Sequence, residues 1–298
     1  IKYAIFKLNL NSMKSDTRAL DIVFLGLAQN CEKFLPSFFK TIKEISKKKN
    51  IKVFLGENGS EDLTFDLIQK NIILNDKINY INTSFIEEFP DRIKRLSLAR
   101  QKLKDHLLHE NLNPKFVCVL DLDEVISKNF NIELINNLEN ILNGHKDKYF
   151  AVSLKSKPFY YDILNFESDE YPNNNILKIQ NSRSIKSYFE RKKFVYNVQN
   201  SLTKKGEFEC ISGFNGLCLY LYDDFIKSHY YDNDLNIIPE HLHLNRIIHK
   251  LTGKKIFVSC NYLKMPTEHK PINNIFYFLA LKLSKYFLIF IKKFKILK

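Results

Sequence analysis

The sequence lacks several features that would assign it to a class at once. It has no internal repeat and no Gly-x-Ser-x-Gly or phosphate-loop pattern. No run of about 20 uncharged apolar residues is present that could cross a bilayer. The five cysteines, Cys31, Cys118, Cys210, Cys218 and Cys260, are an odd number without the spacing of a metal site. These absences argue against repeat architectures, spanning helices and a zinc site, and the cysteine pattern indicates a reducing compartment.

Apolar residues and positive charge, by contrast, are plentiful. The 298 residues are 45% hydrophobic, which is enough for a sizeable core. Lys and Arg number 46 against 33 Asp and Glu, so the formal net charge is +13. This excess favours anionic partners such as nucleotides, nucleic acid or acidic lipid headgroups. The charge alone does not choose among them.

Strand-like and helix-like patterns alternate in the first half of the chain. Short apolar runs rich in β-branched residues predict strands, and amphipathic segments between them predict helices. The predicted strands are 21–27, 51–57, 78–84 and 116–122, and the predicted helices are 31–49, 63–72 and 91–109. This alternation predicts an α/β fold with a mostly parallel sheet and helices on both faces.

Polar clusters follow three of the predicted strands. They are "AQN" (28–30), "ENGSED" (57–62) and "DLDE" (121–124). Because ligands bind beyond the carboxyl ends of the strands in open parallel sheets, we expect the three loops to converge on one binding site. Taken alone, "ENGSED" is equally typical of a glycine-containing turn with a helix cap. The candidate ligand-binding residues of the first two loops are Gln29, Asn30, Glu57 and Asn58.

One arginine lies on the buried side of the predicted helix 91–109. At 100° per residue, Arg100 lies within the apolar stripe. An inward guanidinium needs an anion, which is either a nearby carboxylate or a bound phosphate. The stripe itself comprises Leu96, Ala99, Leu103 and Leu107.

Two aspartates end the fourth predicted strand. The backbone turns there, so Asp121 and Asp123 can reach one cation. Hard oxygen ligands suit Mg²⁺ or Mn²⁺, and such an ion could bridge the oxygens of a diphosphate. The alternative is that an Asp-x-Asp sequence after a strand merely caps the next helix.

The second half of the chain contains one well-marked helix. It is predicted to begin near Pro239 and to stop at Gly253, with Glu240 in its first turn. An acid at that place can simply complement the helix dipole. Residues 156–208 show weak periodicity and predict irregular binding loops or a lid. The predicted buried stripe of the helix comprises Leu244, Ile247, Ile248 and Leu251.

The last segment is basic and apolar without a single acid. On a helix, Lys282, Lys285, Lys292 and Lys293 fall within about a 100° arc, and most of the remaining surface is apolar. This is typical of a helix lying in a membrane interface. The alternative is a helix that packs on the domain or on a dimer partner. The predicted organisation is an N-terminal extension (1–20), two halves of one domain (21–155 and 156–270) and a membrane-associating tail (271–298).

Four motifs together resemble the GT-A type of glycosyltransferase. They are "LGLAQNCEKFL", "ENGSED", "LARQKL" and "VLDLDEV", and the resemblance covers roughly residues 20–265. It implies a GT-A-like, Rossmann-type fold and an enzyme that uses Mn²⁺ or Mg²⁺. The implied reaction moves a sugar from a nucleoside diphosphate sugar to a hydroxyl of a glycan or lipid-linked acceptor, as in surface polysaccharide or glycoconjugate synthesis.

The resemblance also implies roles for single residues. Asp121 would approach the nucleotide ribose and Asp123 the metal, while Glu57 and Asn58 would line the base and ribose pocket. In the second half, Glu240 would accept the proton of the attacking hydroxyl. His269 would bind the metal and is preferred over His243 for that role.

Two other functions fit parts of the sequence. "VLDLDEV" also looks like the first motif of haloacid-dehalogenase-type phosphatases, with Asp121 as nucleophile and "YDD" (222–224) as a metal partner. The chain could also be a non-enzymatic basic protein that binds membrane or nucleic acid by charge. For the transferase we expect no nucleic-acid partner and a cytoplasmic location on the inner face of the membrane.

Overall fold

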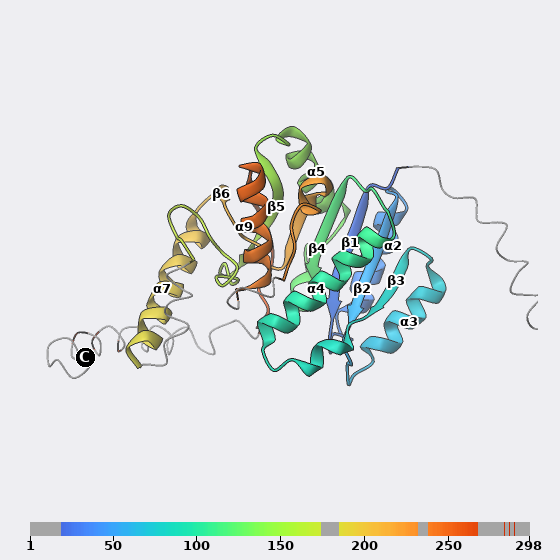
Figure 1. Ribbon diagram of the computed structural model, residues 1–298, viewed down its shortest axis with the longest axis horizontal. Helices are drawn as coiled ribbons and strands as arrows, with labels where there is room; N and C mark the ends of the chain where they lie inside the picture. The colour runs from blue at the N-terminus through green and yellow to red at the C-terminus, as the bar shows by residue number, and fades with distance from the viewer. Residues whose placement is uncertain are drawn as a thin grey trace, which may run out of the picture.

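The computed structural model describes residues 19–173, 185–231 and 238–267, together with Leu283, Tyr286 and Ile289. Helices and strands alternate as predicted through the first half (Figure 1). In chain order the elements are β1 (Ile22–Ala28), α2 (Leu35–Ser46), β2 (Ile51–Glu57), α3 (Thr64–Leu74), β3 (Ile78–Asn82), η1 (Ser84–Glu88), α4 (Arg92–His109), β4 (Phe116–Asp121), η2 (Glu124–Ser127), α5 (Ile132–Gly144), β5 (Tyr149–Lys157), α7 (Ile185–Lys204), β6 (Phe208–Cys210), β7 (Leu217–Leu221), α8 (Tyr222–Phe225), α9 (Glu240–Thr252) and β8 (Lys255–Lys264).

The strands form one sheet that joins both halves of the chain. Its order is β3-β2-β1-β4-β7-β5-β8-β6. Strands β3, β2, β1 and β4 pair in parallel, as do β5 and β8, whereas β7 runs antiparallel to β4 and β5, and β6 runs antiparallel to β8. The predicted α/β fold with a mostly parallel sheet is therefore confirmed.

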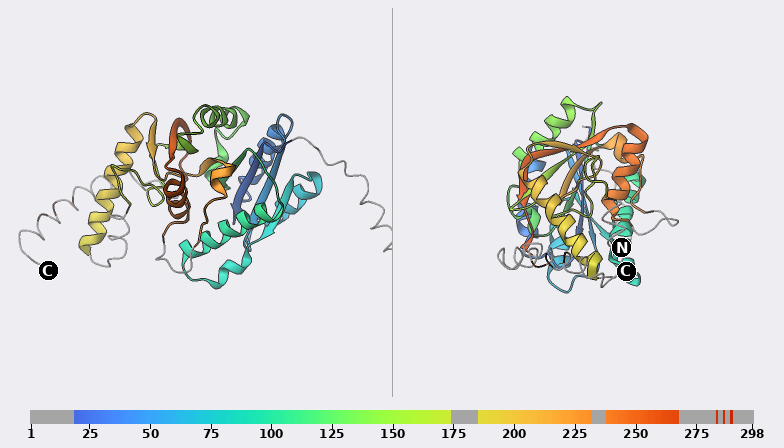
Figure 2. Two further views of the ribbon diagram at one scale, coloured as in Figure 1. Left: turned by 45° about the horizontal axis from the view of Figure 1, so that its top comes forward. Right: turned by 90° about the vertical axis from the view of Figure 1, so that its left-hand side faces the viewer.

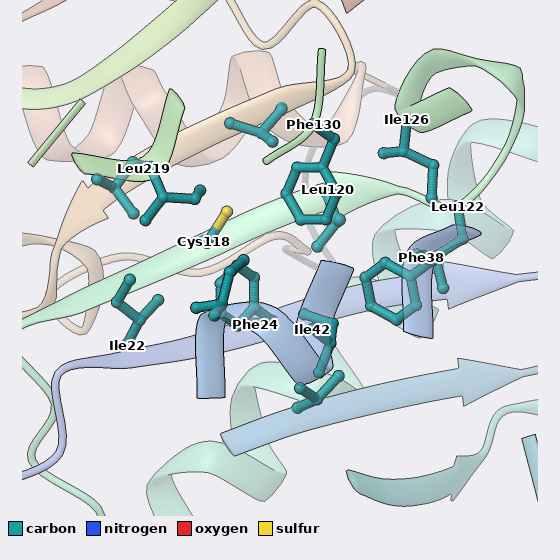
Figure 3. Close-up of a cluster of buried hydrophobic side chains, with 14 of the residues drawn as sticks. Ile22, Phe24, Phe38, Ile42, Cys118, Leu120, Leu122, Ile126, Phe130 and Leu219 are labelled. Carbon is teal, nitrogen blue, oxygen red and sulfur yellow. The ribbon is translucent and has the colours of Figure 1, made fainter. Parts of the chain in front are cut away.

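Helices cover both faces of the sheet, because successive strand residues point to opposite sides. Phe24 of β1 points to the α2 and α5 side, where its ring meets Phe130 edge-on at 6.4 Å and Phe130 stacks on Phe38 of α2 at 6.1 Å (Figure 3). Val23, one residue earlier, belongs to the opposite core, which includes residues of α4, α7 and α9. Figure 2 shows α5 and α9 on opposite sides of the sheet.

Several expectations about the helices were wrong in detail. Leu251 is 61% exposed, and Leu96 and Ile247 are only part-buried. Helix α9 instead buries nearly its whole circumference from Glu240 to Asn245, because its first turns enter the protein and its last turn leaves it. The segment 156–208, predicted as irregular, contains the 20-residue helix α7. In the part of this helix whose side chains the structure describes, Val198 and Leu202 reach the core.

Candidate functional site

The ends of three parallel strands meet at one edge of the sheet. In the strand register, Leu27 of β1 pairs with Asp121 of β4, and Ala28 of β1 pairs with Glu57 of β2. The loops that follow these strands therefore start side by side, and their predicted convergence is confirmed. This edge is where an open parallel sheet binds ligands.

The first two of these loops are bonded to each other. The Asn30 amide donates to Ser60 Oγ at 3.0 Å, and Asn30 Oδ1 accepts from the Glu61 amide at 2.9 Å. Asn30 has a φ of 50°, a left-handed conformation that asparagine tolerates better than most residues. Glu57 is 4% exposed, and its Oε1 accepts from the Ser60 amide at 2.5 Å. Glu57 thus shapes its own turn.

The other two candidate residues of these loops, Gln29 and Asn58, lie nearer to solvent. Gln29 is exposed and Asn58 is part-buried. Both belong to the interlocked pair of loops, so the structure brings the four candidate residues of the sequence together on the β1 and β2 side of the edge.

Arg100 and Asp121 form an ion pair at this edge. Arg100 Nη2 lies 2.5 Å from Asp121 Oδ1, and Nη1 donates to the Leu120 carbonyl at 3.3 Å. The arginine side chain is 3% exposed, whereas that of Asp121 is 31% exposed. Of the two anions expected for Arg100, the structure shows the carboxylate. A charge-assisted bond of this kind fixes Asp121 at the strand end.

Helix α4 is anchored one turn beyond Arg100 by a second buried cation that the sequence did not reveal. Lys104 is 1% exposed, and its Nζ donates to the carbonyl oxygens of Phe225, at 2.6 Å, and Ser228. Burial lowers the pKa of this amine to about 7. The contact joins α4 to the end of α8 and so supports the position of Arg100.

Asp123 and Glu124 have two different roles after β4. Asp123 Oδ1 accepts from the Val125 amide at 2.8 Å, so this residue caps η2, as the capping alternative expected. Glu124 binds Lys264 of β8 and accepts from the Thr267 amide at 2.6 Å. These bonds lower the pKa of Glu124 to about 2. Glu124 therefore fastens the chain beyond β8 to the end of β4.

The residues present are compatible with a metal site that substrate completes. Within the described ranges, no group of three or more His, Cys, Asp or Glu side chains is placed to hold a metal. His269 lies outside the described residues. Asp121 and Asp123 remain, and Mg²⁺ in proteins is often held by one or two carboxylates together with substrate phosphates. Their oxygen donors fit Mg²⁺ or Mn²⁺ in that mode.

Glu240 lies close enough to the Arg100–Asp121 pair for the charges to act on it. It is the first residue of α9 and is 6% exposed. Burial raises its pKa to about 7, against the opposing effect of Arg100, and the charges of Asp162 and Asp121 add to the rise. The structure thus brings the candidate base to the same edge as Asp121. A carboxyl with this pKa changes protonation near neutral pH.

Asp162 is a further acid of the site that sequence reasoning missed. It is part-buried in the loop after β5 and accepts from the Asn165 side chain at 3.1 Å and the Asn215 amide at 3.3 Å. Burial, together with the charge of Asp121, raises its pKa to about 6. No motif marks this residue, since it lies in a segment without periodicity.

The geometry contradicts the phosphatase alternative. Its metal partner would come from residues 222–224, but Leu221 of β7 pairs with Phe116 at the start of β4, far along the strand from Asp121. Asp224 is also buried in ion pairs with Lys227 at 2.9 Å and Lys254 at 2.7 Å. Because β7 runs antiparallel to β4, residues 222–224 lie at the start of β4, at the opposite end of the strand from Asp121.

No family model and no curated protein matches the sequence. Among solved structures, glucosyl-3-phosphoglycerate synthase from Mycobacterium tuberculosis, in complex with phosphoglyceric acid, is 12% identical, with a TM-score of 0.46 over 85% of this chain and 73% of that one. Mannosyltransferase PcManGT from Pyrobaculum calidifontis, in complex with GDP-Man and Mn²⁺, is 9% identical, with a TM-score of 0.48 over 87% and 59%. Mannosyl-3-phosphoglycerate synthase from Rubrobacter xylanophilus is 9% identical, with a TM-score of 0.43 over 94% and 76%. These TM-scores are below 0.5, so the function of this chain has to be argued from its own residues.

Proposed function

We propose that the chain is a metal-dependent glycosyltransferase that moves a sugar from a nucleoside diphosphate sugar to a hydroxyl of a glycan or lipid-linked acceptor. One observation carries the proposal. Glu240, an acid with a pKa of about 7, lies close enough to Arg100 and Asp121, at the carboxyl ends of the parallel strands, for their charges to act on it. A group that can take a proton near neutral pH is therefore electrostatically coupled to a candidate site for a metal-bound diphosphate.

The donor nucleotide would bind at the loops after β1 and β2. Gln29, Asn30 and Asn58 offer amide groups for the base and ribose, and Glu57 keeps the second loop in shape through Ser60. Asp121, held by Arg100, would approach the ribose. Mn²⁺ or Mg²⁺ would be held by Asp121 and Asp123, with His269 as a further ligand, and would neutralise the charge of the departing diphosphate.

The acceptor hydroxyl would approach from the α9 side. Glu240 would take its proton as the oxygen attacks the sugar, because a carboxyl with a pKa near the working pH can accept a proton while roughly half of the molecules carry it ionised. Burial is the main cause that raises the pKa of Glu240, Arg100 limits the rise, and the charges of Asp162 and Asp121 add to it.

Thermal unfolding with nucleoside diphosphates tests the donor site. UDP and GDP, each with and without Mn²⁺, should raise the melting temperature when they bind, by an amount equivalent to about 2.7 kcal/mol at 100 times the dissociation constant. Asp123→Ala should remove the Mn²⁺-dependent part of the rise. If no nucleotide stabilises the protein while random polyanions do, the non-enzymatic basic protein becomes the better account.

We also propose that the basic tail attaches the enzyme to the inner face of the cytoplasmic membrane. In the described part of the chain no helix is long and apolar enough to span a bilayer. Leu283, Tyr286 and Ile289 are helical and are 65%, 68% and 51% exposed, which supports an apolar side at these three described positions. Each lysine near an anionic surface adds about 1 kcal/mol of attraction.

A vesicle assay tests this attachment. The full chain should sediment with vesicles that contain phosphatidylglycerol and less with pure phosphatidylcholine, and salt should weaken the binding. Removal of residues 272–298 should abolish it. Equal sedimentation of the shortened chain would contradict the role of the tail.

A further inference from the structure

The start of α9 is capped from a distant loop. Its own N-cap residue is Pro239, which makes no side-chain cap bond. The first amides of a helix have no partner within the helix, so an outside acceptor stabilises them. Leu242 in the first turn donates its amide hydrogen to Asn165 Oδ1 at 3.2 Å. The helix that carries Glu240 is therefore held from the loop after β5.

The same asparagine binds Asp162 with its other end. Asn165 Nδ2 donates to Asp162 Oδ1 at 3.1 Å. Its backbone carbonyl accepts from Ser212 Oγ at 2.6 Å, and Ser212 Oγ accepts from Asn245 of α9 at 3.0 Å. One amide side chain thus connects the second acid of the site to the helix of the candidate base, and a second bonded path joins the same loop to α9.

Several charged or titratable groups act on Glu240. Arg100 approaches from α4, Asp121 from the end of β4, Asp162 from the loop after β5 and Tyr230 from the segment after α8. His241, the next residue of α9, places its Nε2 3.7 Å from Glu240 Oε1, and burial lowers the pKa of this histidine. Of these neighbours, Asp162 is linked to the backbone of α9 through a single side chain, Asn165.

We propose that Asn165 is a positioning residue that holds the start of α9, and with it Glu240, against Asp162. Its acceptor oxygen fixes the helix and its donor nitrogen fixes the acid. Glu240 is the base only if the proposed function holds, but the linkage itself is independent of that function. The two ends of the amide can be changed separately.

Asn165→Asp removes the amide nitrogen that donates to Asp162 and keeps the oxygen that accepts from Leu242. The carboxylate still accepts from Leu242, but it cannot donate to Asp162 and adds a like charge. The pKa of Glu240, measured by ¹³C NMR with Glu240→Gln for assignment, should rise by about half a unit or more. In the exchanged variant Asp162→Asn with Asn165→Asp, the bond between positions 162 and 165 can form again with donor and acceptor reversed. The amides of Leu242 and Asn215 still donate to the side chains at positions 165 and 162. There the pKa should return to within about 0.2 units of the wild-type value.

The control compares two capping asparagines. Asn131 caps α5 through its Oδ1, which accepts from the Leu134 amide at 2.9 Å. Asn131→Ala and Asn165→Ala should both lower the melting temperature, since each removes a cap. Only Asn165→Ala should lower kcat, by about tenfold, with the KM for the donor sugar changed less than about twofold.

The outcomes separate this proposal from the proposed function. If no UDP- or GDP-sugar is turned over, the function fails, while the pKa of Glu240 still tests Asn165. An unchanged pKa in Asn165→Asp, or no recovery in the exchanged variant, overturns the proposal. Equal loss of kcat in the two alanine variants also overturns it. If Asn165→Ala does not fold, Asn165→Asp still carries the test because it keeps the helix cap.

Discussion

The two sides of the candidate site are held together in different ways. On the donor side, the loops after β1 and β2 lie next to each other because parallel strands bring them there, and exposed bonds such as Asn30 to Ser60 join them. On the proposed acceptor side, Asp162 and Glu240 come from a loop and a helix start, which the side-chain amide of Asn165 joins. We therefore expect the donor side to tolerate changes in its linking bonds better than the acceptor side.

The largest effect should follow from removing Asp123, the metal ligand that we propose. Asp123→Ala should lower kcat by about 10³-fold or more, because a metal that neutralises a leaving group supplies several kcal/mol. The fold should persist, since Asp123 is only part-buried and its bond to Val125 caps a short 3-10 helix. Asp66→Ala, at an exposed position in the first turn of α3, is the control for loss of an acidic side chain. Unchanged turnover in Asp123→Ala would remove this residue from the mechanism.

Glu240→Gln should have the next largest effect. Loss of a general base lowers kcat by about 10² to 10⁴-fold, while binding of the donor should change little. A matching loss of donor affinity would instead indicate a role in binding. In the wild type, kcat should rise with pH through the pKa of about 7, as Glu240 loses its proton.

Whereas kcat should rise with pH, the contribution of Glu240 to the stability of the fold should fall as pH rises. Because folding raises the pKa of Glu240 from 4.5 to about 7, the folded protein favours the protonated acid. Its contribution therefore disfavours the fold increasingly as pH rises from 4.5 to about 7 and then levels off. Glu240→Gln should be more stable than the wild type at pH 8, and this difference should shrink at pH 5, as measured by urea unfolding.

The difference between the two sides also explains what could be predicted from the sequence. The alternating patterns and the chemistry of strand ends placed Asn30, Glu57 and Asp121 at one edge, because those features are local. The place of Glu240 at a helix start could be predicted because Pro239 and Gly253 mark the ends of its helix. The place of Asp162 could not be predicted, since it depends on partners such as Asn215, 53 positions away in the sequence. Such contacts leave no periodic pattern.

Asn215 tests the rigidity of the acceptor side. It is fully buried, its Nδ2 donates to the Leu154 carbonyl at 2.9 Å, and its Oδ1 accepts from the amides of Tyr161 and Asp162 at 3.3 Å. Its φ is 49°. Asn215→Ala should lower the free energy of unfolding by about 2–4 kcal/mol, from the lost buried bonds and the left-handed backbone. Asn215→Gly relieves only the backbone strain, so it should recover only part of the unfolding free energy that Asn215→Ala loses. Full recovery would show that the side-chain hydrogen bonds of Asn215 contribute little.

Glu124, which joins the end of β4 to the chain beyond β8, should stabilise the fold in a pH-dependent way. Its pKa is lowered from 4.5 to about 2 by Lys264 and Thr267, so its stabilisation is present above pH 4.5 and is lost as pH falls toward 2. Glu124→Gln should cost about 1 kcal/mol at pH 7, a modest value because the ion pair is partly screened by solvent. The difference from the wild type should narrow in acid. A constant difference from pH 7 to pH 3 would mean that the charge of Glu124 does not matter.

The smallest effect is expected on the donor side, at Asn30. Its bonds to Ser60 and Glu61 are exposed, so water can replace them at little cost. Asn30→Ala should therefore lose only about 1 kcal/mol, most of it from the left-handed backbone, and Asn30→Gly should lie within about 0.5 kcal/mol of the wild type. Urea unfolding of the two Asn30 variants, measured together with Asn215→Ala and Asn215→Gly, compares their free energies of unfolding directly. Equal losses at the two asparagines would contradict the distinction, because the donor loops would then depend on their side-chain bonds as strongly as the acceptor side does.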